Sequence, residues 1–363
     1  MDFRSPPPIA RALRRAVDHG IFGYPSTPAS LREKLAARME RLYEWKIDPN
    51  WVVPTTGLVS GFHAAAAALC APGEGYLIQP PVYMPFNDLG DHLGLVRQEA
   101  PLSVSEAPEP LKYSINWDVF ESAFGSGGTR TAMFLLCDPH NPVGLAWDEA
   151  AQRRMAETAI SRGAAIVSDE IHAELLLDDI RHRPLAAADA AFAERSVTLV
   201  SPSKTFNIAG LFCGFAIVPD PGIRKAFEKE EERMTLHCTG LSLVAAEEAL
   251  SGSCDSWLDA ARLYLRANRD FVLDFLRERL PGVRAATPAA THLLWMDCRG
   301  LGLESPADFF LEQARVALND GAAFGTGGKG FVRLNFASPR ALLAEALERM
   351  ARALEERGGS ASA

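Results

Sequence analysis

Five short apolar runs between residues 50 and 220 constrain the fold of this chain more than any other feature of its sequence. Each run is apolar on both faces, which is typical of strands in a parallel sheet that helices cover on each side. Helical patterns separate the runs, and one of them, residues 148–162, carries its charges on one face. We therefore predict an α/β fold with a large, mainly parallel, doubly wound sheet. The predicted strands are residues 75–78, 131–136, 164–168, 197–200 and 214–218.

The length and composition indicate a folded protein with two domains. A chain of 363 residues that is 48% hydrophobic and 23% charged is ordinary for such a protein. After the last of the five runs the pattern changes to α+β, with a helix predicted at 306–318 and a strand at 331–335. We predict an N-terminal segment, residues 1–26, that packs with the small domain, a large domain of residues 27–245, a small domain of residues 246–357 and a disordered tail of residues 358–363.

Charge and cysteine content narrow the functional classes. With 37 Lys and Arg against 46 Asp and Glu the net charge is −9, and no basic tract indicates binding to nucleic acid. The six cysteines are scattered without a CxxC pair, so we expect reduced thiols in a cytoplasmic protein and no metal site. The apolar residues 57–71 are fewer than the ~20 that a membrane helix needs, and we interpret them as a buried helix. We therefore expect no membrane partner and no signal peptide.

Three polar residues follow predicted strands and define a candidate active site. Asn141, Asp169 and Lys204 each come at or just after a strand end, which is where parallel sheets bind ligands. A lysine can form an imine, a carboxylate can pair with a pyridinium, and an amide can hydrogen-bond a phenolate. These are the groups that a pyridoxal 5'-phosphate (PLP) site needs. Taken singly, Lys204 could be a solvated charge, Asp169 a helix cap and Asn141 a turn residue.

Other residues are candidates for binding the phosphate of this cofactor. Gly57, Leu58 and Val59 open the predicted buried helix, and backbone N–H groups at a helix start bind phosphate. An ordinary N-cap at these residues is the alternative. Ser201 and Ser203 are the other predicted phosphate donors.

Three more residues are candidates for the ring and the substrate. Tyr83 could stack on the ring and join Lys204 and Asp169 as a catalytic residue, or it could be a tyrosine at the edge of the core. His172 lies three residues past Asp169 and could assist there. Arg333 lies among apolar residues of a predicted strand, where a cation needs a partner. A substrate carboxylate is a natural partner for it, and a structural salt bridge is the alternative.

The segments that contain these residues resemble the fold-type I PLP enzymes, the aspartate aminotransferase superfamily. Within it, the sequence is most similar to the cystathionine β-lyase or C–S lyase branch of the MalY/PatB type. The likeness spans nearly the whole chain and keeps the family's order. It rests on residues 1–3, 19–25, 80–83, 139–144, 168–172, 201–211 and 330–335.

The resemblance implies a homodimer with shared active sites, in which Tyr24 reaches the phosphate of the neighbouring subunit's cofactor. Two departures from the family pattern stand out. Many aminotransferases of the superfamily carry a phosphate-binding arginine a few residues after the lysine, and residues 210–214 contain none, which favours the C–S lyase branch. Family members also have a longer segment before the motif at residues 1–3, so we expect either a truncated start or a missing N-terminal arm.

The expected function is a PLP-dependent β-elimination on an amino acid. It would cleave L-cystathionine or a related cysteine S-conjugate to a thiol, pyruvate and ammonia. An aminotransferase is the alternative, because it shares every step up to loss of the Cα proton. A non-catalytic regulatory protein on the same scaffold is a further alternative, which the presence of Lys204, Asp169 and Arg333 disfavours.

Overall fold

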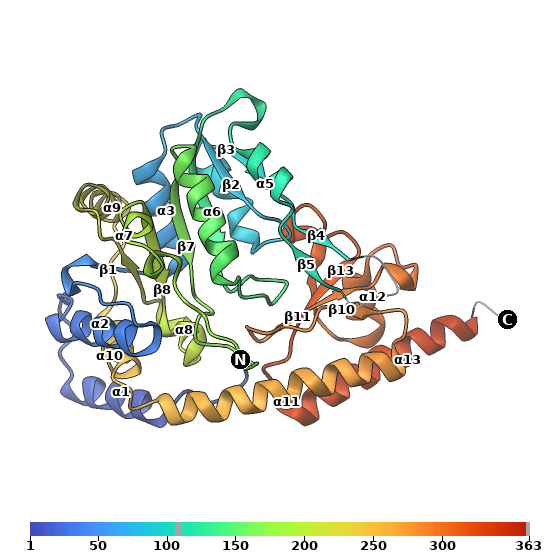
Figure 1. The fold of residues 1–363 in the computed structure, drawn as a ribbon. Helices are drawn as coiled ribbons and strands as arrows, with labels where there is room; N and C mark the ends of the chain where they lie inside the picture. The colour runs from blue at the N-terminus through green and yellow to red at the C-terminus, as the bar shows by residue number, and fades with distance from the viewer. Residues whose placement is uncertain (106–110, 361–363) are drawn as a thin grey trace.

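A computed structural model describes residues 1–105 and 111–360 and contains a seven-stranded sheet. Helices cover both faces of this sheet (Figure 1). The strand order is β1-β9-β8-β7-β6-β2-β3. Only β9 runs antiparallel to its neighbours, so the sheet is mainly parallel, and the predicted fold class is confirmed. The strands are β1 (Val52–Thr55), β2 (Gly75–Ile78), β3 (Val96–Glu99), β6 (Thr131–Cys137), β7 (Ala165–Asp169), β8 (Ser196–Val200) and β9 (Gly214–Ile217).

The central strands are apolar on both faces because each face meets a layer of helices. In β6, Met133 packs in the same core as Phe62 of α3 (Leu58–Leu69), and α9 (Pro221–Arg233) adjoins α3 on this side. The next residue, Phe134, points to the other face, where it contacts Phe120 of α5 (Trp117–Ala123) with ring centroids 5.2 Å apart. Helix α6 (Glu149–Ser161) covers the same face through Met155.

The small domain is built on a four-stranded antiparallel sheet in the order β10-β11-β13-β12. Helix α11 runs along the base of the molecule beside α13, and the hydrophobic core between helices and sheet includes Leu265, Met296, Val332 and Leu347 (Figure 1). The elements are α11 (Asp255–Arg279), β10 (Arg284–Ala285), β11 (Leu293–Asp297), α12 (Pro306–Ala314), β12 (Asn319–Asp320), β13 (Phe331–Asn335) and α13 (Arg340–Ser360).

Two predicted features of this domain differ from the structure. The helix predicted at 306–318 ends at Ala314, because Arg315 adopts a left-handed conformation with φ 55° that closes the helix. Helix α13 continues through Ser360 into the tail predicted to be disordered, and Arg357 supports its last turns by donating to the carbonyls of Leu301 and Gly302. The final residues of that predicted tail, 361–363, lie outside the described residues.

The N-terminal segment touches both domains. Asp2 N donates to Ala337 O at 2.7 Å, and the Phe3 ring packs edge-on against Tyr264 at 5.5 Å, so residues 1–3 contact the small domain. Helix α1 packs against α10, and the predicted domain boundary at 245/246 falls inside α10. The remaining elements are α1 (Pro7–His19), α2 (Ala29–Tyr43), α4 (Leu89–Leu93), β4 (Ser103–Val104), β5 (Tyr113–Ser114), α7 (Ala190–Ala193), α8 (Pro202–Thr205) and α10 (Gly240–Leu250).

No helix within residues 1–105 and 111–360 is both long and apolar enough to cross a membrane.

A buried arginine ties α2 to the centre of the molecule. Arg38 is 2% exposed, and its guanidinium pairs with Glu174, which follows β7, and with Asp255 Oδ1 at 2.9 Å at the start of α11. It also lies 5.4 Å from the ring centroid of Phe206, two residues after Lys204. Removing one partner of a buried ion pair is strongly destabilising because the other charge stays buried.

We expect Arg38→Met to lower the free energy of unfolding by about 3–5 kcal/mol. Arg41 is the matched control, because it pairs with the same Asp255 at 2.8 Å from an exposed position, and Arg41→Met is expected to lower stability by no more than about 1 kcal/mol. Urea denaturation of both variants measures the difference. Equal losses in the free energy of unfolding for the two variants would show that burial of the Arg38 ion pairs does not determine their contribution to stability.

Candidate active site

Lys204 is presented by a short helix at the carboxyl end of the sheet. Strand β8 ends at Val200, and the Ser201 side chain caps α8 by accepting a hydrogen bond from Ser203 N at 3.1 Å. Lys204 is half-buried in the last turn of α8. Burial and the nearby Arg333 lower the pKa of its amine, while Asp169 acts in the opposite direction. A lysine amine with a lowered pKa is more readily neutral, which is the nucleophilic form.

Asp169 is a buried carboxylate at the end of β7. It is 4% exposed and accepts a hydrogen bond from Ile171 N at 3.1 Å. Burial raises the pKa of its carboxyl to about 7. Within residues 1–105 and 111–360, it has no cation within ion-pair distance. A buried carboxylate lacking a cation suits a ligand that brings a protonated ring nitrogen.

Arg333 points toward the same edge of the sheet from β13. Its Nη1 donates to Asn141 Oδ1 at 2.8 Å and its Nη2 donates to Asn319 Oδ1 at 2.9 Å. The guanidinium lies 4.8 Å from the Phe324 ring centroid, and burial lowers the pKa of Arg333 to about 10. Among the residues that the structure describes, no carboxylate forms a salt bridge with it, so the alternative of a structural ion pair finds no support.

These contacts leave Arg333 and Asn141 free for an anionic ligand. Both bonds of Arg333 go to neutral amide oxygens, and its buried Nε has no hydrogen-bond partner among the described residues. Because the Asn141 oxygen faces Arg333, the amide N–H groups of Asn141 remain able to donate elsewhere. An arginine fork without a carboxylate is a site for a carboxylate ligand.

Tyr83 and His172 interact electrostatically with the charged residues of the candidate site. Burial raises the pKa of the half-buried Tyr83, with a further contribution from the Asp169 charge. His172 is buried, and burial together with Lys204 and Arg333 lowers its pKa to about 3, so its imidazole is neutral. The structure thus groups Tyr83 and His172 with Lys204, Asp169 and Arg333.

The candidate phosphate residues lie beside the lysine segment. Gly57 precedes α3 with φ 141°, a conformation that favours glycine, so the N–H groups of Leu58 and Val59 begin a helix of 12 residues. A Cβ on Gly214 would lie only 2.7 Å from Leu58 Cδ1, which shows how closely β9 approaches this helix start. The predicted helix-start site and the segment that follows Lys204 are therefore adjacent.

The two predicted phosphate serines differ in what they contact. The Ser201 hydroxyl donates to Cys213 O at 2.7 Å while accepting from Ser203 N, so its proton is already used within the protein. Ser203 is half-buried in the first turn of α8, directly before Lys204. Ser203 is thus the better placed of the two to donate to a ligand.

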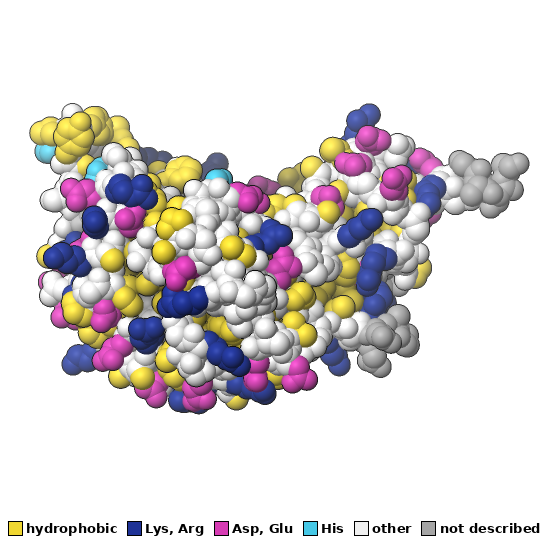
Figure 2. All heavy atoms as spheres, turned by 90° about the horizontal axis from the view of Figure 1, so that it is seen from above, with side chains coloured by type: hydrophobic (Ala, Val, Ile, Leu, Met, Phe, Trp, Pro, Cys, Tyr) yellow, Lys and Arg dark blue, Asp and Glu magenta, His cyan; other side chains and the backbone are white. Residues whose placement is uncertain are grey.

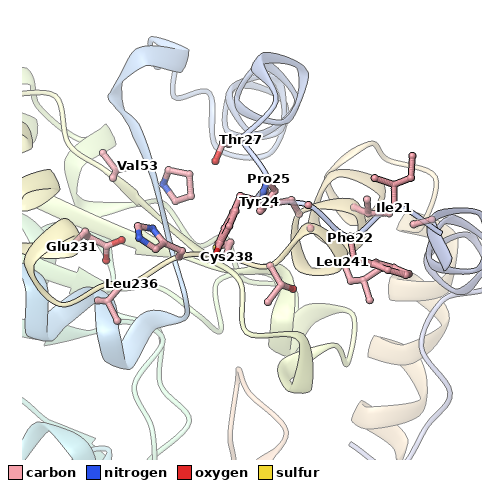
Figure 3. Close-up of a pocket in the computed structure, with 18 of the residues that line it drawn as sticks. Ile21, Phe22, Tyr24, Pro25, Thr27, Val53, Glu231, Leu236, Cys238 and Leu241 are labelled. Atoms are coloured by element: carbon pink, nitrogen blue, oxygen red, sulfur yellow. The ribbon is translucent and has the colours of Figure 1, made fainter. Parts of the chain in front are cut away.

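Tyr24 stands apart from this group. Its side chain is fully exposed, at 108% of the reference area, on the segment between α1 and α2. It lines a pocket of about 1320 Å³ together with Val53, Glu231 and Cys238 (Figure 3). Within one chain, the structure does not bring Tyr24 to Lys204 through any contact among the described residues.

Sequence reasoning missed two residues at the site. Asn319 holds Arg333 from β12, a strand of two residues that is too short to give a periodic signal. His292 is buried beside His172 with ring centroids 5.7 Å apart, and burial lowers its pKa well below the ordinary value. A lone histidine in a loop gives no sequence signal of its own. Both residues reach the site only through the packing of the small domain on the large one.

A buried polar cluster supports the loops that carry the site. His182 Nε2 lies 3.0 Å from Glu170 Oε2, and its Nδ1 lies 3.9 Å from Asp138 Oδ2. Those two carboxylates raise the pKa of His182 against the effect of burial. Because Glu170 follows Asp169 and Asp138 begins the turn that ends at Asn141, the cluster fixes the two segments that carry these candidate residues relative to each other.

Comparison with known proteins places this geometry in a family. Residues 1–350 match the family described as "Aminotransferase class I and II". The chain belongs to this family. It is 34% identical to cystathionine beta-lyase PatB of Bacillus subtilis over 357 residues, which covers 98% of this chain and 90% of PatB. It is 32% identical to the cystathionine beta-lyase of Corynebacterium glutamicum, covering 97% and 91% of the two chains.

Solved structures of the family agree with the fold. Cystalysin from Treponema denticola, which contains a pyridoxal 5'-phosphate cofactor, superposes with a TM-score of 0.93 at 29% identity and covers 98% of this chain and 89% of that one. The resemblance inferred from the sequence motifs is therefore confirmed.

The buried Asp169 carboxyl makes stability depend on pH when no cofactor is bound. Its pKa rises from the ordinary 3.8 to about 7 in the folded protein, so the folded state keeps a proton that the unfolded state has released. Stability should then fall as pH rises between these two values, by on the order of 2–4 kcal/mol. In Asp169→Asn this loss should be absent. Urea denaturation of the two cofactor-free proteins across that pH range measures their free energies of unfolding. If the free energies of the native protein and of Asp169→Asn changed in parallel with pH, the raised pKa of Asp169 would be contradicted.

Proposed function

We propose that this protein is a PLP-dependent C–S β-lyase of the cystathionine β-lyase type. The observation that carries the proposal is the grouping of Lys204, whose amine has a lowered pKa, with the buried Asp169 carboxyl and with Arg333. Among the residues that the structure describes, neither Asp169 nor Arg333 has a salt-bridge partner. The near full-length similarity to cystathionine β-lyases supports the same conclusion. The proposed substrate is L-cystathionine or a related cysteine S-conjugate, cleaved to a thiol, pyruvate and ammonia.

The residues of the site suit PLP group by group. Asp169 would hold the ring nitrogen in its protonated form, Asn141 would donate to the phenolic oxygen, and Tyr83 would stack on the ring. The N–H groups of Leu58 and Val59, with Ser203, would hold the phosphate. Bound PLP supplies an electron sink for the bond that breaks at Cα. His172 is neutral and therefore adds no charge that would compete with Asp169.

The chain's own residues then orient the substrate and move its proton. Arg333 binds the α-carboxylate through its planar fork, in the position that the Asn141 and Asn319 oxygens fix. Lys204 accepts the Cα proton, because the lowered pKa of its amine makes the neutral form available. The leaving thiolate departs from Cβ, and hydrolysis of the remaining three-carbon fragment gives pyruvate and ammonia.

Transamination is the second candidate, because the same residues would act up to removal of the Cα proton. The segment after the lysine favours elimination: residues 210–214 lack the phosphate-binding arginine that many aminotransferases carry there. A non-catalytic role has no structural support, since Lys204, Asp169 and Arg333 are all present and grouped.

Lys204→Ala is expected to reduce the rate of pyruvate release roughly a thousandfold, because the proton acceptor at Cα is lost. The measurement is a coupled pyruvate assay with L-cystathionine on protein saturated with PLP. Lys225→Ala, at an exposed position of α9, is the matched control and should be unchanged. Retention of most activity by Lys204→Ala would overturn the central role of this residue.

We further propose that the protein is a cytoplasmic homodimer with shared active sites. Ile21, Phe22 and Tyr24 are exposed by 73%, 67% and 108% in one segment, an unusual density of exposed apolar side chains. Figure 2 shows hydrophobic side chains gathered on a projection at one corner of the molecule. A second copy that covered this segment would bring Tyr24 to the neighbouring phosphate site. The six free cysteines support a reducing compartment.

Hybrid dimers test the sharing of the site. A dimer of one Lys204→Ala subunit and one Tyr24→Ala subunit would contain one native site only if Tyr24 serves the opposite subunit. Co-expressing the two weakly active variants should then recover about a quarter of the native specific activity, since half the dimers are hybrids with one site each. If Tyr24 acted within its own subunit, no hybrid site would be native and activity would not recover.

A further inference from the structure

Two cysteine thiols face each other on the phosphate side of the site. Cys213 precedes β9, and Cys238 lies in the loop between α9 and α10. Their sulfur atoms are 3.8 Å apart, and Cys238 Sγ also donates to Thr55 O at 3.2 Å. The sulfurs would need to approach by about 1.75 Å to reach the ~2.05 Å of a disulfide bond.

The pair differs in access to solvent. Cys213 is buried at 4% exposure, whereas Cys238 is half-buried and lines the pocket that Tyr24 also lines (Figure 3). The contact with Cys213 lowers the pKa of the Cys238 thiol, and the same contact raises the pKa of Cys213. Cys238 is thus the more accessible thiol of the two, and Cys213 is placed to react with it second.

A metal site does not explain the pair. Within residues 1–105 and 111–360, no group of three or more His, Cys, Asp or Glu side chains could hold a metal ion. Two thiols at this separation without further ligands suit a disulfide better than a structural metal.

Both cysteines belong to segments that adjoin the candidate phosphate site. The Cys213 carbonyl accepts the Ser201 hydroxyl at 2.7 Å, and Ser201 caps the helix that carries Lys204. The Thr55 carbonyl that Cys238 contacts lies two residues before Gly57. Drawing the sulfurs together changes the contact of Cys238 Sγ with Thr55 O, and any backbone adjustment at Cys213 moves the carbonyl that Ser201 contacts.

We propose that Cys213 and Cys238 form a reversible disulfide that loosens the phosphate site. The effect on the cofactor rests on the proposed PLP-dependent function, whereas formation of the disulfide does not. The oxidant is a low-molecular-weight disulfide, RSSR. The Cys238 thiolate attacks one sulfur of RSSR and releases RS⁻. Cys213, having lost its proton to solvent, attacks Cys238 Sγ and releases the second RS⁻. In sum, two protein thiols are oxidised to one disulfide and RSSR is reduced to two RSH.

The test uses the PLP-loaded holoenzyme in buffers of rising glutathione disulfide to glutathione ratio. Mass spectrometry of a non-reducing digest reports the linkage, and loss of visible absorbance on dilution into PLP-free buffer reports cofactor dissociation. We expect a Cys213–Cys238 peptide and dissociation about fivefold faster than in the reduced enzyme, as for the loss of one hydrogen bond, with both effects reversed by dithiothreitol. Cys238→Ser should abolish both effects. Cys70→Ser, at the other half-buried cysteine, should leave them unchanged.

Two results would overturn the inference. One is the absence of the Cys213–Cys238 peptide in excess glutathione disulfide. The other is a linked protein that releases PLP at the rate of the reduced enzyme. Failure of PLP binding, on which the proposed function depends, gives a different result: the reduced protein would then show no PLP absorbance, while the digest would still report whether the disulfide forms.

Discussion

The constraint on which the rest of the structure depends is the burial of the Asp169 carboxylate at the end of β7, where it has no salt-bridge partner among the described residues. Burial raises its pKa to about 7, so the folded protein bears an unfavourable carboxyl when no ligand is present. Parallel strands β6, β7 and β8 bring the Asn141 turn, Asp169 and Lys204 to one edge, and β13 brings Arg333 from the other domain. A cofactor with a cationic ring together with a substrate that carries a carboxylate would satisfy these groups.

The two domains contribute different parts of this site. The large domain supplies the groups suited to the cofactor, whereas Arg333, its partner Asn319 and His292 come from the small domain. The N-terminal residues reinforce the junction: Asn207, three residues after Lys204, donates to Met1 O at 2.9 Å and to Phe3 O at 2.6 Å, while Asp2 bonds Ala337. Residues 1–3 therefore connect the segment after Lys204 to the segment after β13.

The sequence predicts those features that leave a pattern within a short stretch of residues, and it does not predict those that arise only from packing. Five strands were predicted because both of their faces are apolar: β2, β6, β7, β8 and β9. The candidate residues Lys204, Asp169 and Asn141 were predicted because they come at or just after the ends of these strands. The edge strand β3 has a largely polar sequence and β1 contains Pro54, so neither gave a signal. Asn319 and His292 come to the site through domain packing, which leaves no pattern in the sequence. The role of Tyr24 was predicted from the family resemblance, and one chain does not bring Tyr24 to Lys204.

The most direct measurement of the central claim is product formation from L-cystathionine by PLP-loaded protein without any 2-oxo acid acceptor. The account predicts that thiol and pyruvate appear together in equal amounts over many turnovers, and that adding 2-oxoglutarate leaves the rate unchanged. Thiol and pyruvate that stay below one equivalent per active site, with turnover that begins only when 2-oxoglutarate is added, would contradict the lyase and establish transamination instead.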